Sequence, residues 1–549
     1  MNDANNSRAM IVHMAFAVAL SLSLSILAAE KKIITASWAT CNMTPAELLE
    51  HADELDKTAL DGFTIRFAPA RNCVTGKVCR ADGLRFDPPW RYVDFADQIP
   101  TIRELLKHKA FGESLIRGWS ILDRRVDWKD DKAWANFAHN FGVFARLVKA
   151  TGSKGIVIDH EDYHKIKQFF RAEGDPDYDE LVKIVRRRGA EVFAPAFWEY
   201  PEMVVLSFWM LSLPFDERYC TQQPDVAGMT REKGDLWPAF FNGILDVMPP
   251  EATLVDGCEH AYSFEFFRND FFRSAALQRT GLLDLVAPEN RRKYRAPLRA
   301  GFGLYTTVWF SERKKGYRWW QGPRNGSRLN HFEANLNQAF EAADEYVWIF
   351  SEHGTWGDWP EEVLRRVLPR MEPSRFKPLE ELLPGFNSVV AAVKNPLAWG
   401  ERRIAEMRMN GTLVDLLKAG GARRCDDKGY VTLRVDKVRP GERYAFEVVV
   451  RPELTRPIFT TRFRKPEADK EQVLWMVSRD SLYKPLTNGL ARAFDVVRVP
   501  DTGADFADGV VIFTGTNATV SASAIVDAHV YRIPYVDAMN NQVNEVKDK

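Results

Sequence analysis

Hydrophobic positions between residues 33 and 351 follow two alternating patterns. Short runs rich in β-branched and aromatic residues recur, and between them apolar residues repeat every three or four positions, as on one face of a helix. Because strands that alternate with helices form parallel βαβ units, eight such strands predict a (β/α)8 TIM barrel, with a doubly wound sheet as the structural alternative. The predicted strands are 33–38, 62–67, 115–122, 155–159, 203–211, 253–257, 303–310 and 345–351.

Capping residues and helix breakers mark the ends of the predicted helices. The segment 44–47, Thr-Pro-Ala-Glu, is a capping box with proline at the first helical position. A second helix has apolar residues over 134–148, with an acidic cap before it and Gly152 as its stop. A third extends over 177–200, where Pro195 predicts a kink or an early end. Further helices are predicted over 237–248, 264–281 and 329–343.

The pattern changes beyond Pro373. Residues 379–419 are typical of helices or a linker, and short strands separated by turns follow from Tyr430 onward. Strands at this spacing predict an all-β sandwich behind the barrel. The predicted strands of the sandwich include 430–435, 444–450, 473–477, 493–499, 509–515 and 521–533.

The first residues are typical of a targeting segment. Residues 10–29 are apolar, Arg8 precedes them, and Ala28 and Ala29 stand before the charged Glu30. This is the pattern of a secretory signal peptide, with a single membrane anchor as the alternative. We therefore expect a secreted or periplasmic protein with no membrane contact after signal cleavage. The predicted organisation is a signal peptide over 1–29, a catalytic barrel over 30–378, a helical linker over 379–424, a β-sandwich over 425–536 that could bind carbohydrate, and a disordered tail over 537–549.

Composition excludes some classes of partner. The chain of 549 residues has 75 Lys+Arg and 75 Asp+Glu, so its formal net charge is zero and gives no overall attraction to nucleic acid or anionic membranes. Its 46% hydrophobic and 27% charged content is that of a globular protein. Among the 6 cysteines, Cys73 and Cys79 could pair or stay free, and no CxxC zinc pattern occurs.

Carboxylates follow three of the predicted strands, at the end where a barrel has its active site. Asp159 and Glu161 stand two apart after the fourth strand, so both point to one face of a continuing strand. Such a pair divides into one protonated and one ionised carboxyl, which glycosidic cleavage needs. Glu259 follows the sixth strand and Glu352 the eighth. We predict these four as catalytic residues; the alternatives are rim salt bridges for the first two and a helix cap for Glu259.

Aromatic residues near the strand ends offer surfaces for sugar rings. The chain has 16 Trp, and 12% of its residues are aromatic. The alternative for each tryptophan is a place in the hydrophobic core. No dinucleotide fingerprint, phosphate-binding loop or nucleophile elbow occurs, and neither a cofactor nor a metal is predicted. The predicted substrate-binding residues are Trp38, Trp119, Tyr163, Trp309 and Trp356.

The segment 155–163, GIVIDHEDY, resembles the fourth-strand motif of chitinase-like glycoside hydrolases, which ends in Asp-x-Glu followed by Tyr. The resemblance implies that Glu161 is a general acid and that Asp159 orients an N-acetyl group of the substrate. The positions of that family's earlier aspartates hold Lys154 and Val157 in this chain.

The barrel as a whole is similar to secreted barrel glycosidases of polysaccharide-degrading bacteria, whose last strand often reads like residues 346–352, YVWIFSE. We therefore predict an exported glycoside hydrolase that acts on a poly- or oligosaccharide. One alternative is a non-catalytic glycan-binding protein. Another is a metal-dependent hydrolase or deacetylase, because His160, His164, His260 and His353 stand beside acidic residues near strand ends. The sugar, the linkage and the oligomeric state are left open by the sequence.

Overall fold

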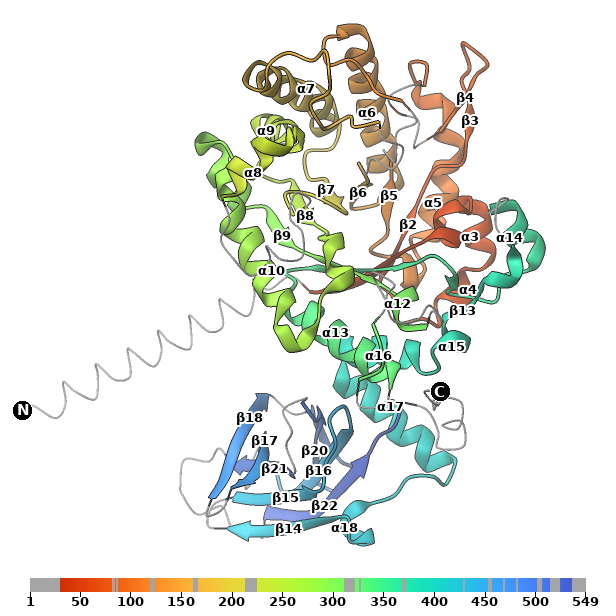
Figure 1. The fold of residues 1–549 in the computed structure, drawn as a ribbon. Helices are drawn as coiled ribbons and strands as arrows, with labels where there is room; N and C mark the ends of the chain where they lie inside the picture. Colours follow the sequence, from red (N-terminus) through yellow and green to blue (C-terminus); the bar gives the residue numbers. More distant parts are fainter. Residues whose placement is uncertain are drawn as a thin grey trace, which may run out of the picture.

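The computed structural model describes most of the chain between Glu30 and Tyr535 (Figure 1). The predicted signal peptide and tail lie outside the described residues, as does Cys220. The described ranges are 30–80, 84, 87–118, 124–160, 166–212, 225–310, 321–324, 327–367, 372–427, 430–452, 457–467, 470–479, 482–500, 506–513 and 524–535.

A closed parallel sheet forms the centre of the first part of the chain. Its strand order is β10-β11-β1-β2-β5-β6-β7-β8-β9, and all neighbouring strands are parallel. The strands are β1 (Lys32–Ser37), β2 (Gly62–Ile65), β5 (Leu115–Arg117), β6 (Gly155–Ile158), β7 (Val204–Ser207), β8 (Thr253–Asp256), β9 (Leu298–Ala300), β10 (Phe302–Tyr305) and β11 (Tyr346–Ser351).

The two edges of this sheet are halves of one strand. Only Gly301 separates β9, which pairs with β8, from β10, which pairs with β11, so the sheet closes on itself as an eight-stranded barrel. A Cβ at Gly301 would lie 3.0 Å from both the Tyr346 carbonyl oxygen and Val255 Cγ1, which explains why glycine stands at the junction. The predicted (β/α)8 fold is therefore confirmed.

Helices cover the outside of the barrel (Figure 1). The helices α7 (Tyr178–Glu199) and α9 (Trp237–Val247) approach closely, because Gly189 and Gly243 face the partner backbone. A Cβ at Gly243 would lie 1.9 Å from the Arg186 carbonyl oxygen. The other larger barrel helices are α3 (Pro45–Glu50), α5 (Ile99–Leu105), α6 (Asp131–Thr151), α10 (Asp270–Arg279), α13 (Arg328–Ala342) and α16 (Phe386–Lys394). Shorter elements are α2 (Trp38–Asn42), α4 (Ala52–Leu55), α8 (Val226–Lys233), α11 (Arg291–Arg295), α12 (Thr307–Phe310), α14 (Glu361–Val367), α15 (Leu379–Leu382), α18 (Leu416–Ala419), β3 (Ala70–Arg71), β4 (Val78–Cys79), β12 (Gly354–Thr355) and β13 (Lys377–Pro378).

Local signals placed several helix ends correctly. Thr44 forms the predicted capping box of α3, and Gly152 ends α6 in the left-handed conformation with φ of 84°. The predicted early end at Pro195 is wrong, because α7 continues to Glu199. The helix predicted from residue 264 begins only at Asp270. The carboxylate of Asp270 accepts a hydrogen bond from the backbone N–H of Glu265 at 3.0 Å.

The strand predicted over 303–310 is wrong in its second half. After Tyr305 the chain has reached the end of the barrel, and residues 307–310 form the single helical turn α12. The Trp309 N–H donates to the Thr306 carbonyl at 3.0 Å, so local hydrogen bonds replace the strand pairing that β-branched residues favoured.

Two antiparallel sheets form the C-terminal part of the chain and confirm the predicted sandwich. A small core lies between them, to which Val431, Leu433, Phe446 and Phe463 contribute. The five-stranded sheet contains β14 (Ala422–Asp427), β15 (Tyr430–Asp436), β21 (Phe506–Phe513), β17 (Pro457–Glu467) and β18 (Lys470–Arg479) in this order. The four-stranded sheet contains β19 (Leu482–Pro485), β20 (Ala491–Arg498), β16 (Arg443–Val450) and β22 (Ile525–Arg532).

The sandwich is fixed to the barrel by packing and by charge. Helix α17 (Pro396–Met409) contributes Trp399 to a cluster that includes Phe494 of the four-stranded sheet. At the other contact Glu333 of α13, which is 0% exposed, pairs with both Arg443 and Arg498 of the sandwich. The Nε atom of Arg498 lies 2.6 Å from Glu333 Oε1. A carboxylate buried between two guanidinium groups ties the two parts into one body.

The remaining sequence predictions concern membranes and cysteines. In the described part of the chain, no helix has both the length and the apolar character that crossing a membrane requires. Cys73 and Cys79, on the β3–β4 hairpin, are both free thiols. Burial raises the pKa of the Cys79 thiol to about 12.

Candidate active site

The carboxyl ends of the barrel strands bring three of the predicted acidic residues to one rim. Asp159 directly follows β6, Glu259 stands three residues beyond β8, and Glu352 directly follows β11. Glu161, Tyr163 and Trp119 lie outside the described residues. Trp38 begins α2 at the end of β1, so it too belongs to this end of the barrel.

Asp159 is held by an arginine from the neighbouring strand. Its carboxylate is 6% exposed and accepts a hydrogen bond from the Arg117 guanidinium at 2.8 Å. Arg117 ends β5, which pairs with β6 through Arg117 and Val157. This charge-assisted contact holds the Asp159 carboxylate in a fixed orientation. Sequence reasoning missed Arg117, whose one local signal is a basic residue at the end of a predicted strand.

Aromatic side chains fill the barrel beneath this ion pair. The Arg117 guanidinium carbon lies 5.9 Å from the ring centroid of Phe208, which follows β7. Phe208 in turn stacks on Trp348 of β11 with ring centroids 4.1 Å apart. The Trp348 indole N–H donates to the Gly257 carbonyl at 2.7 Å. The charged pair therefore lies next to aromatic rings, where its electrostatic interactions are stronger than in water.

Glu259 follows an unusual backbone conformation. Cys258 is buried and has a φ of 39°, which non-glycine residues seldom adopt. The chain turns there, and the Glu259 N–H donates to the Phe208 carbonyl at 3.0 Å. Left-handed backbone at a residue with a side chain costs about 1 kcal/mol and is found most often at functional sites. The half-buried Glu259 directly follows this left-handed residue.

Asp256 ends β8 and is fully buried. Its carboxylate accepts backbone N–H groups of Leu211 and Ser212 at 3.1 Å and of Cys258 at 3.2 Å. Burial raises the pKa of this carboxyl, although the donors oppose that effect. Asp256 therefore joins the segment after β7 to the segment after β8 and supports the turn at Cys258.

Glu352, Trp309 and Trp356 have different surroundings. The Glu352 side chain is 28% exposed, and His353 Nδ1 lies 3.7 Å from its carboxylate. Trp356 is 6% exposed, and its indole N–H donates to Thr35 Oγ1 at 2.8 Å. Trp309 is 2% exposed and packs edge-on against a phenylalanine of α13. A role in stacking on sugars stays a prediction for both tryptophans, and their burial favours the core alternative.

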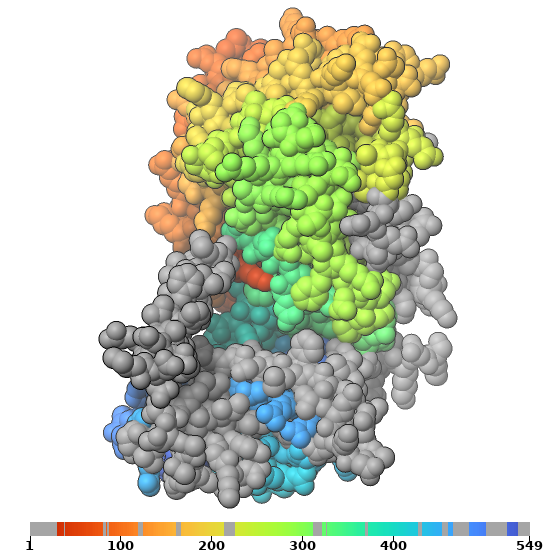
Figure 2. All heavy atoms as spheres, turned by 90° about the vertical axis from the view of Figure 1, so that its left-hand side faces the viewer, coloured from red at the N-terminus to blue at the C-terminus, as the bar shows by residue number. Residues whose placement is uncertain are grey.

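One face of the molecule is hollowed in the space-filling view. Figure 2 shows red atoms of the N-terminal segment at the bottom of a recess, bordered by green and teal atoms from the later part of the barrel. Segments far apart in the sequence therefore meet at this face, as the closed strand order requires.

The histidines near the strand ends contact tryptophan rings. His160 is 4% exposed and stacks on Trp237 with centroids 3.5 Å apart and planes at 12°. The His260 ring meets Trp209 edge-on at 4.6 Å. His164 lies outside the described residues. The His160 and His260 rings thus pack on tryptophans, whereas the ring centroid of His353 lies 5.9 Å from that of Phe376.

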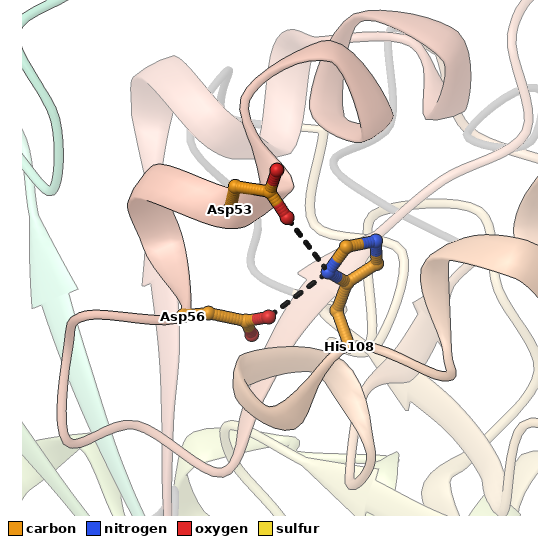
Figure 3. Close-up of side chains that lie close together, drawn as sticks. All are labelled: Asp53, Asp56 and His108. Carbon is orange, nitrogen blue, oxygen red and sulfur yellow. Dashed lines mark hydrogen bonds and ion pairs between the residues drawn. The ribbon is translucent and has the colours of Figure 1, made fainter.

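Among the described residues, one group of three side chains could hold a metal ion, and it is formed by Asp53, Asp56 and His108 (Figure 3). His108 Nδ1 lies 2.9 Å from Asp56 Oδ2 and 3.7 Å from Asp53 Oδ1, and the Asp53 side chain is fully exposed. These residues precede β2 and β5, so they belong to the amino ends of the strands. The group is therefore at the opposite end of the barrel from the candidate site.

Asp235 is a rim carboxylate that the sequence analysis did not single out. It lies in the segment between β7 and α9, is 3% exposed, and accepts the Trp237 backbone N–H at 2.9 Å. Burial raises its pKa to about 6. Its neighbour Trp237 is the ring on which His160 stacks. The sequence around Asp235 does not distinguish it from a solvent-exposed helix cap. Its burial depends on loops that come together only in the tertiary structure.

No protein family and no curated protein matches the sequence. Similar solved structures include 3-keto-D-glucoside 4-epimerase from E. coli, with 13% identity and a TM-score of 0.29 over 62% of this chain and 98% of that chain. A chitinase domain from Pyrococcus furiosus has 9% identity and a TM-score of 0.32 over 66% and 97%. The GH113 β-mannanase from Alicyclobacillus acidocaldarius has 12% identity and a TM-score of 0.33 over 67% and 97%. The fold assignment rests on the strand order, not on these low scores.

Proposed function

We propose that this protein is an exported glycoside hydrolase that cleaves a poly- or oligosaccharide at the carboxyl end of its barrel. The observation that carries the proposal is the nearly buried Asp159–Arg117 pair at the same rim as the half-buried Glu259 and Glu352. Several carboxyl groups in unlike environments at one rim are what acid–base cleavage of a glycosidic bond requires.

The proposed roles follow from these environments. Glu161, two residues beyond Asp159, donates a proton to the leaving glycosidic oxygen. Asp159 is its partner, and its carboxylate stabilises the positive charge that develops on the sugar ring in the transition state. Either Glu259 or Glu352 attacks the anomeric carbon or activates a water. The first route retains the anomeric configuration and the second inverts it.

The test is reducing-sugar release from a panel of polysaccharides and aryl glycosides. Wild type is compared with Glu161→Gln and with Glu251→Gln, a matched change at an exposed residue before β8. We expect release by wild type and by Glu251→Gln and a loss of at least ~100-fold in Glu161→Gln, since general acid catalysis contributes about that much or more.

Each arm of the test has an opposing outcome. EDTA-treated wild type should keep its activity; a loss restored by added Zn²⁺ would instead support the metal-dependent alternative. Equal activity in wild type and Glu161→Gln would refute the assigned general acid. Tight glycan binding without release from any substrate would favour the binding protein.

A further inference from the structure

Two loops of the rim present an arginine stacked on a phenylalanine. Phe267 lies in the 3₁₀ turn Phe266–Arg268 beyond β8, and Arg324 lies between β10 and α13. Both loops follow the carboxyl ends of their strands, so they belong to the same end of the barrel as the candidate site. The Arg324 guanidinium carbon lies 3.9 Å from the Phe267 ring centroid, and that ring is 49% exposed.

The N–H groups of the stacked Arg324 guanidinium can still donate hydrogen bonds to a ligand. A guanidinium group that lies over an aromatic face has its five N–H donors in its own plane, where a carboxylate or sulfate can reach them. Arg324 is exposed, and within the described ranges no carboxylate forms an ion pair with it. Arg268 lies 6.0 Å from the same ring and is paired with Asp270. Within the described residues, Arg324 is therefore the cation beside Phe267 that is not paired with a carboxylate.

A buried polar network fixes these two loops to each other. His331 of α13 lies 2.7 Å from Glu265 Oε2 of one loop and 2.6 Å from the Gly322 carbonyl of the other. Asn335, one turn further along α13, donates to Gln321 Oε1 at 3.0 Å. His331 and Asn335 are each 1% exposed. Loops held in this way lose little conformational entropy when a ligand binds, which favours a preorganised binding surface.

We propose that Arg324, supported by Phe267, binds a carboxylate or sulfate group of the substrate, so that the substrate is an anionic glycan. The proposal rests on the proposed glycosidase function, to which it adds the substrate class. Arg324 is the anion-binding residue, and Phe267 is a positioning residue that keeps the guanidinium group over its ring. Neutral glycans of the same length and linkage would lack this contact.

The experiment measures direct binding in the Glu161→Gln background, so that hydrolysis does not consume the ligand. The probes are oligogalacturonides against their methyl esters, and sulfated galactan oligosaccharides against the desulfated forms. We expect about tenfold or more tighter binding of a charged member, the effect of one charge-assisted contact at a rim. Arg324→Gln should remove this preference, Arg324→Lys should keep part of it, and Phe267→Leu should weaken it.

Arg273→Gln is the matched control, because Arg273 is exposed on α10 and is not part of the patch. The preference should persist in this variant. No charge preference in either pair, or an equal loss in Arg273→Gln and Arg324→Gln, would overturn the proposal. Hydrolysis of neutral glycans without charge preference would leave the glycosidase function standing. Charge-dependent binding by Glu161→Gln, with no hydrolysis of any probe by the wild type, would keep the anion site and refute that function.

Discussion

The two ends of the barrel contain similar charged groups in different surroundings. At the carboxyl end, Arg117 pairs with an Asp159 side chain that is 6% exposed. At the amino end, His108 pairs with Asp56, which is 27% exposed, and approaches the fully exposed Asp53 (Figure 3). By residue type alone, Asp53, Asp56 and His108 would bind a metal ion better than Arg117 and Asp159 would. Burial and place on the barrel favour the first as the reactive site.

The physical reason is the dielectric environment. Charges near water are screened and hydrated, so an exposed pair contributes little to stability or to reactivity. Charges that lie next to apolar rings such as Phe208 and Trp348 attract each other more strongly and hold a fixed geometry. Loops at the amino ends of barrel strands are associated with stability, and those at the carboxyl ends with chemistry. The comparison predicts that effects of substitution follow burial.

The largest effect is expected at Glu333, a fully buried carboxylate of α13 that extends the comparison to complete burial. Glu333→Gln leaves Arg443 and Arg498 without their shared counter-charge, which costs about 3–5 kcal/mol for a buried pair. Urea unfolding measured by tryptophan fluorescence checks this. Glu341→Gln, at an exposed position of α13, is the control. A decrease in unfolding free energy of less than about 1 kcal/mol in Glu333→Gln would mean that burial does not determine the size of the substitution effect.

Asp235 gives a pH-dependent version of the same test. Its folded pKa of about 6 is raised above the ordinary value of 3.8, so the folded state binds the proton more tightly than the unfolded state. The resulting stability is full below pH ~4 and is lost as the pH rises towards ~6. The unfolding free energy of wild type minus that of Asp235→Asn should therefore decrease by up to about 3 kcal/mol as the pH rises from ~4 to ~6. Urea titrations at several pH values check it, and a constant difference would contradict it.

Asp159 and Asp56 allow the two ends to be compared directly in activity. Asp159→Asn should lower kcat/KM by about 100-fold or more, equivalent to about 2.7 kcal/mol, because it removes the rim carboxylate and leaves Arg117 unmatched. Asp56→Asn should change kcat/KM less than about twofold, since Asp56 lies at the amino end of the barrel, opposite the candidate site. Both are measured on a substrate identified in the glycan panel. Equal losses would show that the two ends are not distinct in function.

The smallest effect is expected at Asp53. Its side chain is fully exposed and 3.7 Å from His108, so Asp53→Asn should leave the thermal midpoint and the activity unchanged. Circular dichroism melting curves of the variant and wild type check this. A lowered midpoint in metal-free buffer, or a rise with Zn²⁺ in wild type alone, would reveal a structural role that the exposure does not suggest.

Much of the fold could be predicted because its signals are local. Each of the eight predicted barrel strands corresponds to a strand of the structure, and the capping box at Thr44 and the helix stop at Gly152 lie where expected. The turn at Thr307 was missed, since β-branched residues favour a strand until the barrel ends. The closing of β9 and β10 around Gly301 also depends on neighbours that are distant in sequence.

The sequence by itself determined the periodicity, the capping residues and the candidate carboxylates, because each depends on side chains within a few positions of one another. Only the tertiary structure decided that Arg117 holds Asp159, that Trp309 and Trp356 are buried, and that Glu333 joins barrel and sandwich. Burial and ion pairing are properties of surroundings built from segments up to hundreds of residues apart. A pattern along the chain contains no information on which of its charges will lose contact with water.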